Sequence, residues 1–360
     1  MIRNRYSLRL TAEFGYDYMF DIDRDILSID VGKGTQDILF FDPEKSVENS
    51  VKFVLPSPNV IVGKEIMAAV RTGRPIHLKG FTMGGGDCVA AIMHAVNSGT
   101  GVTATEEAAL TIRDNADSVR EKGIKITSCA PSDAVVIETR DFMEREIKGV
   151  FDSFSLDYPK NFAFAVQDHG YSPDMSNRIY RMNLFRELLD ENDWVLNSLT
   201  SDPPHPSMTR MRSVLKQAPG SLVTDTGPAA IMGALCDPVV KKMSESGLVL
   251  VNAGNGHTLV FTIKGTEIYG IFEHHTGRLS TAGLLKYIEE LKRGTISGKE
   301  VFDDNGHGAE VRKPLLTDNI AVTGPNRFKL LPDAYQAAPY GDMMLSGCFG
   351  LLRFWEELRG

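Results

Sequence analysis

Cysteine is scarce in this 360-residue chain, and the four that occur are far apart in sequence: Cys88, Cys129, Cys236 and Cys348. A structural zinc site or an iron–sulfur cluster normally shows closely spaced cysteine pairs. No C-x-x-C pair is present, so the sequence argues against both kinds of site. We expect four reduced, mostly buried thiols, as in a cytoplasmic protein.

Long apolar runs and runs of basic residues are also missing. No stretch approaches the roughly 20 apolar residues that a membrane helix needs, and the opening segment MIRNRYSLRL has no apolar region typical of a secretory signal. We therefore expect a cytoplasmic location and no membrane partner. The formal net charge is −8, and without a basic run a nucleic-acid partner has no electrostatic support.

The composition is that of a globular protein, with 42% hydrophobic and 24% charged residues, and the length suits two domains. Apolar β-type runs alternate with segments of helical spacing, and some runs form hairpins, which indicates an α/β protein with mixed sheets. One unit, strand–glycine turn–strand–strand–helix, occurs near residues 25–71 and again near 248–292. This repeat predicts two lobes from a duplicated ancestor, expected at residues 1–168 and 169–360, the second lobe ending in a C-terminal helix.

The first glycine turn follows an apolar strand that ends at Asp30. Gly32 and Gly34 permit a positive φ and close approach to a ligand, and the turn's N–H groups can converge on phosphate. Thr35 adds a hydroxyl, Lys33 can face phosphate or solvent, and Asp30 can hold Mg²⁺ through water. Taken alone, a tight hairpin without a ligand explains these residues better.

A second turn has the same layout, which favours the phosphate interpretation. It begins at Asn252, has glycines at Gly254 and Gly256, and is followed by His257 and Thr258. Asn255 lies between the glycines. If the two turns face each other across a cleft, their amides can bind phosphates from both sides.

Together these motifs resemble those of the superfamily that contains actin, the heat-shock chaperone ATPases and the sugar kinases. Asp30-x-Gly32-x-Gly34-Thr35 resembles the first phosphate motif, and Asn252-x-Gly254-x-Gly256-x-Thr258 the second. The segment 225–233 resembles both the chaperones' connecting helix and the sugar-kinase segment that carries the catalytic base. Residues 320–326 resemble the adenosine motif. The motifs occur in the expected order over residues 30–347.

The resemblance implies a two-lobed actin-like ATPase fold, a duplicated ribonuclease H-like fold with mixed sheets and a central cleft. It also implies ATP and Mg²⁺ as cofactors. Asp30 would organise Mg²⁺, Asp225 would act as base, and Gly324 and Asn326 would border the adenosine. As an alternative, Asp225 is a helix N-cap. The sequence departs from the pattern at Asn252, where relatives usually have aspartate.

More closely, the chain resembles an archaeal and bacterial family that is labelled as related to pyruvate formate-lyase activating enzymes. The matching segments are 83–86, 273–276 and 341–350. A radical-SAM activase needs three clustered cysteines to hold its iron–sulfur cluster, so the sequence argues against that activity.

Other segments carry candidate substrate and metal residues. Gly85 and Asp87 precede a helix, a position suited to anions, and Asp168 and His169 follow a strand, where ligand crevices form. A plain connection and a turn-capping aspartate are the alternatives. The polar loops of the second lobe hold four histidines that can form a metal site if they converge: His257, His274, His275 and His307.

Three functions therefore remain open. The first is an ATP- and Mg²⁺-dependent kinase or ATPase acting on a small-molecule substrate. The second is a nucleotide-responsive module that clamps a protein partner or cofactor with little hydrolysis, which Asn252 favours. The third is a metal-dependent small-molecule enzyme that reuses the cleft.

Overall fold

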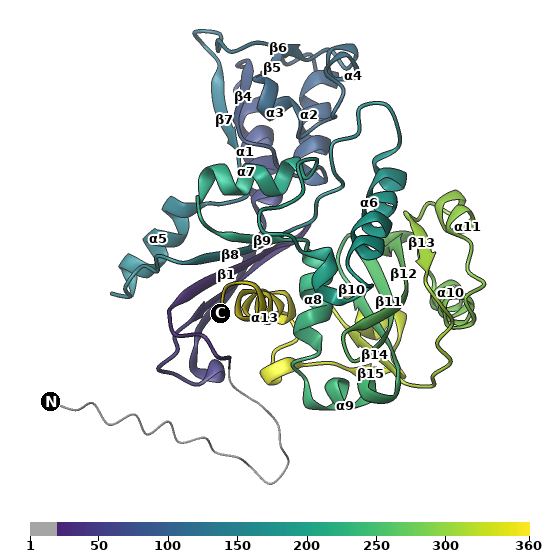
Figure 1. Ribbon diagram of the computed structural model, residues 1–360. Helices are drawn as coiled ribbons and strands as arrows, with labels where there is room; N and C mark the ends of the chain where they lie inside the picture. Colours follow the sequence, from purple (N-terminus) through teal and green to yellow (C-terminus); the bar gives the residue numbers. More distant parts are fainter. Residues whose placement is uncertain (1–19) are drawn as a thin grey trace, which may run out of the picture.

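The computed structural model describes residues 20–360 and contains two mixed sheets joined by helices (Figure 1). The N-terminal segment in which the sequence shows no secretory signal lies outside this range. Among the described residues, no helix has both the length and the apolar character to cross a bilayer.

The first sheet has the strand order β3-β2-β1-β8-β9. Its members are β1 (Ile26–Val31), β2 (Thr35–Phe41), β3 (Val51–Pro56), β8 (Phe162–Val166) and β9 (Leu222–Thr224). The first three strands form an antiparallel meander, and β8 and β9 run parallel to β1. All six residues of β1 are buried, because it is a central strand covered on both faces.

The second sheet repeats this order, β12-β11-β10-β14-β15, and adds β13 beside β12. Its members are β10 (Leu248–Ala253), β11 (His257–Lys264), β12 (Glu267–His275), β13 (Gly308–Val311), β14 (Ile320–Thr323) and β15 (Tyr335–Gln336). Pairing is again antiparallel among the first three strands and parallel from β10 to β14 and β15. The shared order confirms the duplicated, two-lobed actin-like fold.

Two helices cross between the sheets and exchange lobes. Helix α8 (Thr226–Ala234) follows the first sheet in sequence but packs on β10 and β14, whereas α13 (Ser346–Arg359) follows the second sheet and packs on β1 and β8. The helices touch at glycines, since a Cβ at Gly233 or Gly350 would lie within 2 Å of a backbone oxygen of the other helix. Only glycine permits so close a crossing.

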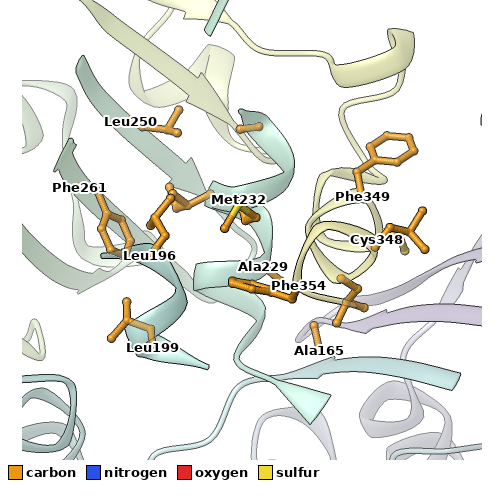
Figure 2. Packing of buried hydrophobic residues seen from close by; sticks show 14 of the residues in the cluster. Ala165, Leu196, Leu199, Ala229, Met232, Leu250, Phe261, Cys348, Phe349 and Phe354 are labelled. Carbon is orange, nitrogen blue, oxygen red and sulfur yellow. The ribbon is translucent and has the colours of Figure 1, made fainter. Parts of the chain in front are cut away.

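The main hydrophobic core surrounds this crossing (Figure 2). Ala229 and Met232 of α8 and Phe354 of α13 lie between Ala165 of the first sheet and Phe261 of the second. The outer face of the first sheet is covered by α5 (Glu144–Ser153) and α7 (Thr209–Gln217). The outer face of the second is covered by α10 (Thr281–Arg293), α11 (Gly298–Asp303) and α12 (Arg327–Leu330). Two further helices complete the lobes, α6 (Asn177–Glu191) and α9 (Pro238–Ser246).

An insertion between β3 and α5 has a sheet and core of its own. Its parallel strands have the order β6-β5-β4-β7. They are β4 (Ile76–Gly80), β5 (Val102–Ala104), β6 (Lys125–Ile126) and β7 (Val135–Thr139), with helices α1 (Pro58–Val70), α2 (Asp87–Asn97), α3 (Glu106–Ala109) and α4 (Ala116–Glu121). The sequence pattern did not reveal this unit, because β5, β6, α3 and α4 are too short to show a period.

The lobe boundary expected at residue 168 does not coincide with the end of the first sheet. The first sheet ends only with β9 at Thr224, and α13 from the far end of the chain returns to cover β1. The hydrophobic pattern of the sequence does not reveal that α8 and α13 exchange lobes, because each helix has the same apolar face whichever sheet it covers.

Candidate functional site in the interlobe cleft

The two glycine turns lie face to face, as their matched patterns predict. A Cβ built on Gly34 would lie 3.4 Å from the side-chain Nδ2 of Asn255, and one built on Gly256 would lie 3.4 Å from Cδ of Lys33. The β1–β2 turn of one lobe therefore contacts the β10–β11 turn of the other.

Both turns close with the same hydrogen bond. The amide of Gly32 donates to the carbonyl oxygen of Thr35 at 2.8 Å, and the amide of Gly254 donates to that of His257 at 3.0 Å. A Cβ on either glycine would crowd that oxygen, at 3.1 and 2.9 Å. None of the four turn glycines, Gly32, Gly34, Gly254 and Gly256, has a positive φ, so the expectation of a positive φ is wrong for both turns. Glycine is needed there for close approach instead.

A cavity of about 370 Å³ opens beside the turns. This volume lies in the range of small-molecule sites. The lining comes from both glycine turns, the insertion, the loop after β8, helices α6, α7 and α8, and strands β11 and β12: Val31, Gly32, Lys33, Asn59, Gly84, Gly85, Gly86, Gln167, His169, Arg181, Arg210, Thr226, Gly227, Asn252, Gly254, Asn255, Gly256, His257, Leu259, Glu273 and His275. The cavity thus joins three parts of the chain that are remote in sequence.

Asn59 ties the insertion to the first turn. Its Nδ2 donates to the carbonyl of Lys33 at 3.2 Å, and its Oδ1 accepts from the amide of Cys88 at 2.9 Å, at the start of α2. Gly86 packs so closely on this side chain that a Cβ would lie 2.7 Å from Nδ2. Gly85 lines the cavity from the same loop, whereas Asp87 is exposed and outside the lining.

Buried charges converge on Arg181 of α6, which is 1% exposed. Its Nη1 and Nη2 donate to the two carboxylate oxygens of Asp225 at 2.6 and 2.9 Å, and its Nε donates to Glu273 at 2.6 Å. Gln167 donates to the other oxygen of Glu273 at 2.9 Å. Burial by itself raises the pKa of Glu273. The charge of Arg181, together with the neighbouring imidazoles, has the opposite and larger effect, so the pKa of Glu273 is lowered.

Asp225, expected as a base or a helix cap, caps α8 and has no free oxygen. Oδ1 accepts from the amide of Gly227 at 3.0 Å and Oδ2 from the amide of Asp168 at 3.1 Å, in addition to the Arg181 guanidinium. The residue is 0% exposed and outside the cavity lining. With four donors on two oxygens, this carboxylate holds Arg181 in place.

Asp168 and His169 have different surroundings although they are adjacent. Asp168 is buried and caps two segments, accepting from the amides of Gly170 at 2.9 Å and Met211 at 3.0 Å. Burial raises its pKa to about 6. His169 instead points into the cleft and lines the cavity.

A smaller cavity of about 80 Å³ lies on the other side of the turns. Asp30 and Asp37, cross-strand neighbours on β1 and β2, line it together with Thr35 and Gly324. Burial raises the pKa of Asp30 to about 7 and that of Asp37 to about 8, and the nearby Asp30 carboxyl adds to the shift of Asp37. The hydroxyl of Thr226 donates to Asp30, while Oδ1 of Asp37 is buried and has no hydrogen-bond partner among residues 20–360.

Two residues expected at the nucleotide support the second turn from behind. Thr258 is 0% exposed, and its hydroxyl bonds that of Thr276 at 3.0 Å, which in turn donates to the carbonyl of Gly254 at 2.8 Å. Asn326 donates to the same carbonyl at 3.0 Å. Neither lines either cavity. Gly324 does line the smaller one, with φ +93° and its amide directed at Sδ of Met343 at 3.1 Å.

Four histidines gather at one wall of the larger cavity. Nε2 of His169 lies 3.0 Å from Nε2 of His307, and the ring centroids of His257 lie 4.7 Å from those of His275 and 4.8 Å from those of His307. Burial is the main cause that lowers the pKa of each imidazole, to about 4 for His257 and well below its usual value for His169.

His274 does not join this group. Successive residues of a strand point to opposite faces, so His274 of β12 turns away from the cleft, toward Tyr287, with ring centroids 6.1 Å apart. Three of the rings, those of His169, His257 and His307, have ligand nitrogens within 4.8 Å of one another. The expected metal set therefore loses His274 and His275 and gains His169, which was expected at the substrate.

Four polar residues of the cleft belong to no motif of the sequence: Asn59 and Arg181, which are buried, and Gln167 and Arg210, which are partly exposed. Arg210 donates twice to Asp141 and once to the carbonyl of Gln167. One signal was available for Arg181: it shares the buried face of α6 with Leu184, Phe185 and Leu188. An arginine on an apolar helix face is normally paired in the interior.

Fold and site together define a two-lobed protein of the actin-like ATPase fold with a ligand-sized cleft at its matched glycine turns. The chain belongs to the family described as "Putative pyruvate format-lyase activating enzyme (DUF1786)", whose model matches residues 83–329. No curated protein sequence matches it significantly. Within residues 20–360 the four cysteines are free and lie in separate segments, Cys88 in α2, Cys348 in α13, and Cys129 and Cys236 in two different loops. They therefore do not fit the iron–sulfur cluster of a radical-SAM activase.

Several solved structures share the fold at low similarity. A Ppx/GppA family member from Aquifex aeolicus is 11% identical, with a TM-score of 0.30, over 84% of this chain and 67% of its own. A polyphosphate/ATP-glucomannokinase from an Arthrobacter strain is 11% identical, with a TM-score of 0.34, over 94% and 100%. A Bacteroides thetaiotaomicron protein with an actin-like ATPase fold is 8% identical, with a TM-score of 0.38, over 92% and 98%.

Proposed function

We propose that this protein binds a nucleotide–Mg²⁺ complex between its two glycine turns and transfers a phosphoryl group to water or to a small acceptor in the larger cavity. The observation that carries the proposal is the contact between two matched turns, each closed by the same glycine hydrogen bond. Phosphoryl transfer depends mainly on positioning and electrostatic stabilisation, which opposed backbone turns supply.

The Asp30 side of the turns fits a divalent cation. Two buried carboxyl groups lie together there, and in the described part of the chain Oδ1 of Asp37 has no hydrogen-bond partner. Mg²⁺ prefers oxygen ligands and usually retains several waters, so Asp30 and Asp37 would hold it directly or through water. When bound, Mg²⁺ neutralises the charge of the phosphate oxygens.

The adenosine side must open before a nucleotide enters. The cavity beside Gly324 is about 80 Å³, and Met343 and Met344 line it. That volume is well below the roughly 300 Å³ at which ligand sites begin. We therefore propose that the lobes move apart to admit the nucleotide and close over its phosphates, as in other two-lobed enzymes.

Asp225 acts in this proposal as a positioning residue rather than a base. Its four hydrogen bonds hold Arg181 at the cavity wall. Lys33, which is exposed and lies over Gly256, is the flexible cation at the turns. We propose that its ammonium contacts phosphate.

Calorimetric titration of the metal-free and Mg²⁺-loaded protein with ATP, ADP and tripolyphosphate tests the proposal. We expect Mg²⁺-dependent binding that Gly34→Val weakens at least about tenfold, because its side chain would fill the space between the turns. Gly277→Val is the matched control, since that glycine is exposed, has open space around it and no positive φ. Unchanged affinity in Gly34→Val would contradict the phosphate site.

Phosphate release, measured with and without hydroxyl compounds, separates an enzyme from a nucleotide-responsive clamp for a protein partner. Turnover supports phosphoryl transfer. Binding without turnover favours the clamp, an outcome consistent with Asn252 at a position where related ATPases usually have aspartate.

A further inference from the structure

We propose that His169, His257 and His307 bind a transition-metal ion of the Zn²⁺ class at the wall of the larger cavity. The three residues come from three places: the loop after β8 in the first lobe, the start of β11, and the residue before β13. Sheet pairing brings them together, because β11 and β13 both flank β12, and the lobes face each other at this point.

The spacing of the ring nitrogens suits one ion. One ligand nitrogen from each histidine lies within 4.8 Å of the others, and the Nε2 atoms of His169 and His307 are 3.0 Å apart. A Zn–N bond of about 2.0–2.1 Å places tetrahedral nitrogens roughly 3.3 Å from one another. A contraction of about 1.5 Å along the longest edge therefore completes the site.

The imidazole nitrogens of this cluster are incompletely hydrogen-bonded within the described residues. Within residues 20–360, the ring of His307, which is 1% exposed, bonds only another imidazole, through its Nε2 to Nε2 of His169, and its Nδ1 has no partner. The ring of His257 makes contacts with other imidazoles but no hydrogen bond within the described residues. Buried polar nitrogens are normally paired, so such a set of imidazoles indicates a ligand that the protein itself does not supply.

The chemistry of the ligands selects the class of metal. Imidazole suits Zn²⁺, Cu²⁺, Ni²⁺ and Fe²⁺, whereas Mg²⁺ prefers oxygen. Three histidines with one open position are typical of catalytic zinc. The site is therefore distinct from the carboxylate pair at Asp30, on the other side of the turns, and it requires no nucleotide.

The open position faces the cavity. His169 and His257 line it, and His275 lies alongside, with its ring centroid 4.9 Å from that of His307. An ion held there would bind an anionic oxygen of a small ligand, either a carboxylate or a phosphate, opposite the Gly84–Gly86 loop.

Cobalt titration of the chelator-treated full chain is the direct test. We expect one Co²⁺ per chain, with the intense visible absorption of four-coordinate Co²⁺, and displacement by Zn²⁺. His257→Gln and His169→Gln should each weaken binding by about 100-fold, since even the loss of an outer-shell partner costs about 10–100-fold. His94→Gln is the matched control because His94 is exposed on α2, away from the cleft.

Two outcomes would overturn the site: no stoichiometric Co²⁺ binding by the wild-type chain, or equal affinity in the wild type and both cleft variants. X-ray absorption of the Zn²⁺-loaded wild type gives a reading that depends on no variant, and a shell without imidazole would also reject the site. Because no nucleotide is present in these measurements, their failure would leave the phosphate-site proposal standing.

Discussion

The two lobes share one strand order but differ in charge beneath their glycine turns. In the first lobe, Asp30 pairs across the strands with Asp37, both with raised pKa values. At the matching place in the second lobe, Asn252 pairs with Leu259. One turn therefore follows a pair of carboxyl groups and the other an amide beside an apolar side chain, so duplication kept the backbone while the chemistry became asymmetric.

The turns also differ in what holds them. The carbonyl of Lys33 in the first turn accepts from Ser57 and Asn59, at the start of the insertion. The carbonyl of Gly254 in the second accepts from Thr276 and Asn326 of its own lobe. The first turn is thus coupled to the insertion, whereas the second depends on its lobe alone.

The largest effect is expected at Arg181, which forms buried ion pairs with Asp225 and Glu273. Arg181→Met would leave Asp225 and Glu273 buried without their partner and should lower the free energy of unfolding by about 3–5 kcal/mol. Lys148→Met is the control, because its ion pair with Asp152 is at the surface and such pairs contribute about 0–1 kcal/mol. Urea unfolding measures both, and similar losses in the two variants would contradict the buried network.

The acidic pair contributes a pH dependence opposite in sign to that of the cleft histidines, whose pKa values burial lowers. The folded protein holds a proton on Asp37 up to about pH 8, whereas an unfolded aspartate releases it near pH 3.9. Between these values the folded state binds an additional proton at Asp37, so the contribution of this residue to the free energy of unfolding should fall as pH rises. Asp37→Asn should flatten the fall by more than about 1.4 kcal/mol, the equivalent of one pKa unit.

Chemical unfolding at intervals from pH 5 to pH 8 checks this expectation. Leu259→Asn, at the matching position of the second lobe, is the control for inserting an amide there, and its pH slope should equal that of the wild type. Equal pH slopes in the wild type and in Asp37→Asn would reject the raised pKa of Asp37.

The smallest effect concerns the supports of the turns. Asn59→Ala removes two buried hydrogen bonds and should cost about 1–2 kcal/mol, with faster amide exchange in the first turn only. Asn326→Ala should increase exchange in the second turn only. Hydrogen exchange of residues 32–35 and 254–257 tests this, and equal changes in both turns under either substitution would show that the two supports are not separate.

The repeated strand–turn–strand pattern was sufficient to predict the duplicated α/β fold, because alternating burial along a strand and glycine at a crowded hairpin are local properties of the sequence. The sequence also placed Asp30, Gly32 and Gly254 at strand ends that line the cleft. Distant neighbours decide the role of other residues: Thr258 and Asn326 support a turn from behind. Asp225, expected as a base or as a helix N-cap, caps α8 while its oxygens also accept from Arg181.

By itself, then, the sequence determined the longer strands and helices and the two glycine turns, since those follow from period and backbone sterics. Only the tertiary structure decided that α8 and α13 exchange lobes, that Arg181 joins Asp225 to Glu273, and that His169 rather than His274 meets His257 and His307. The reason is physical: burial, ion pairing and convergence depend on residues more than 40 positions apart, whose distances no local pattern encodes.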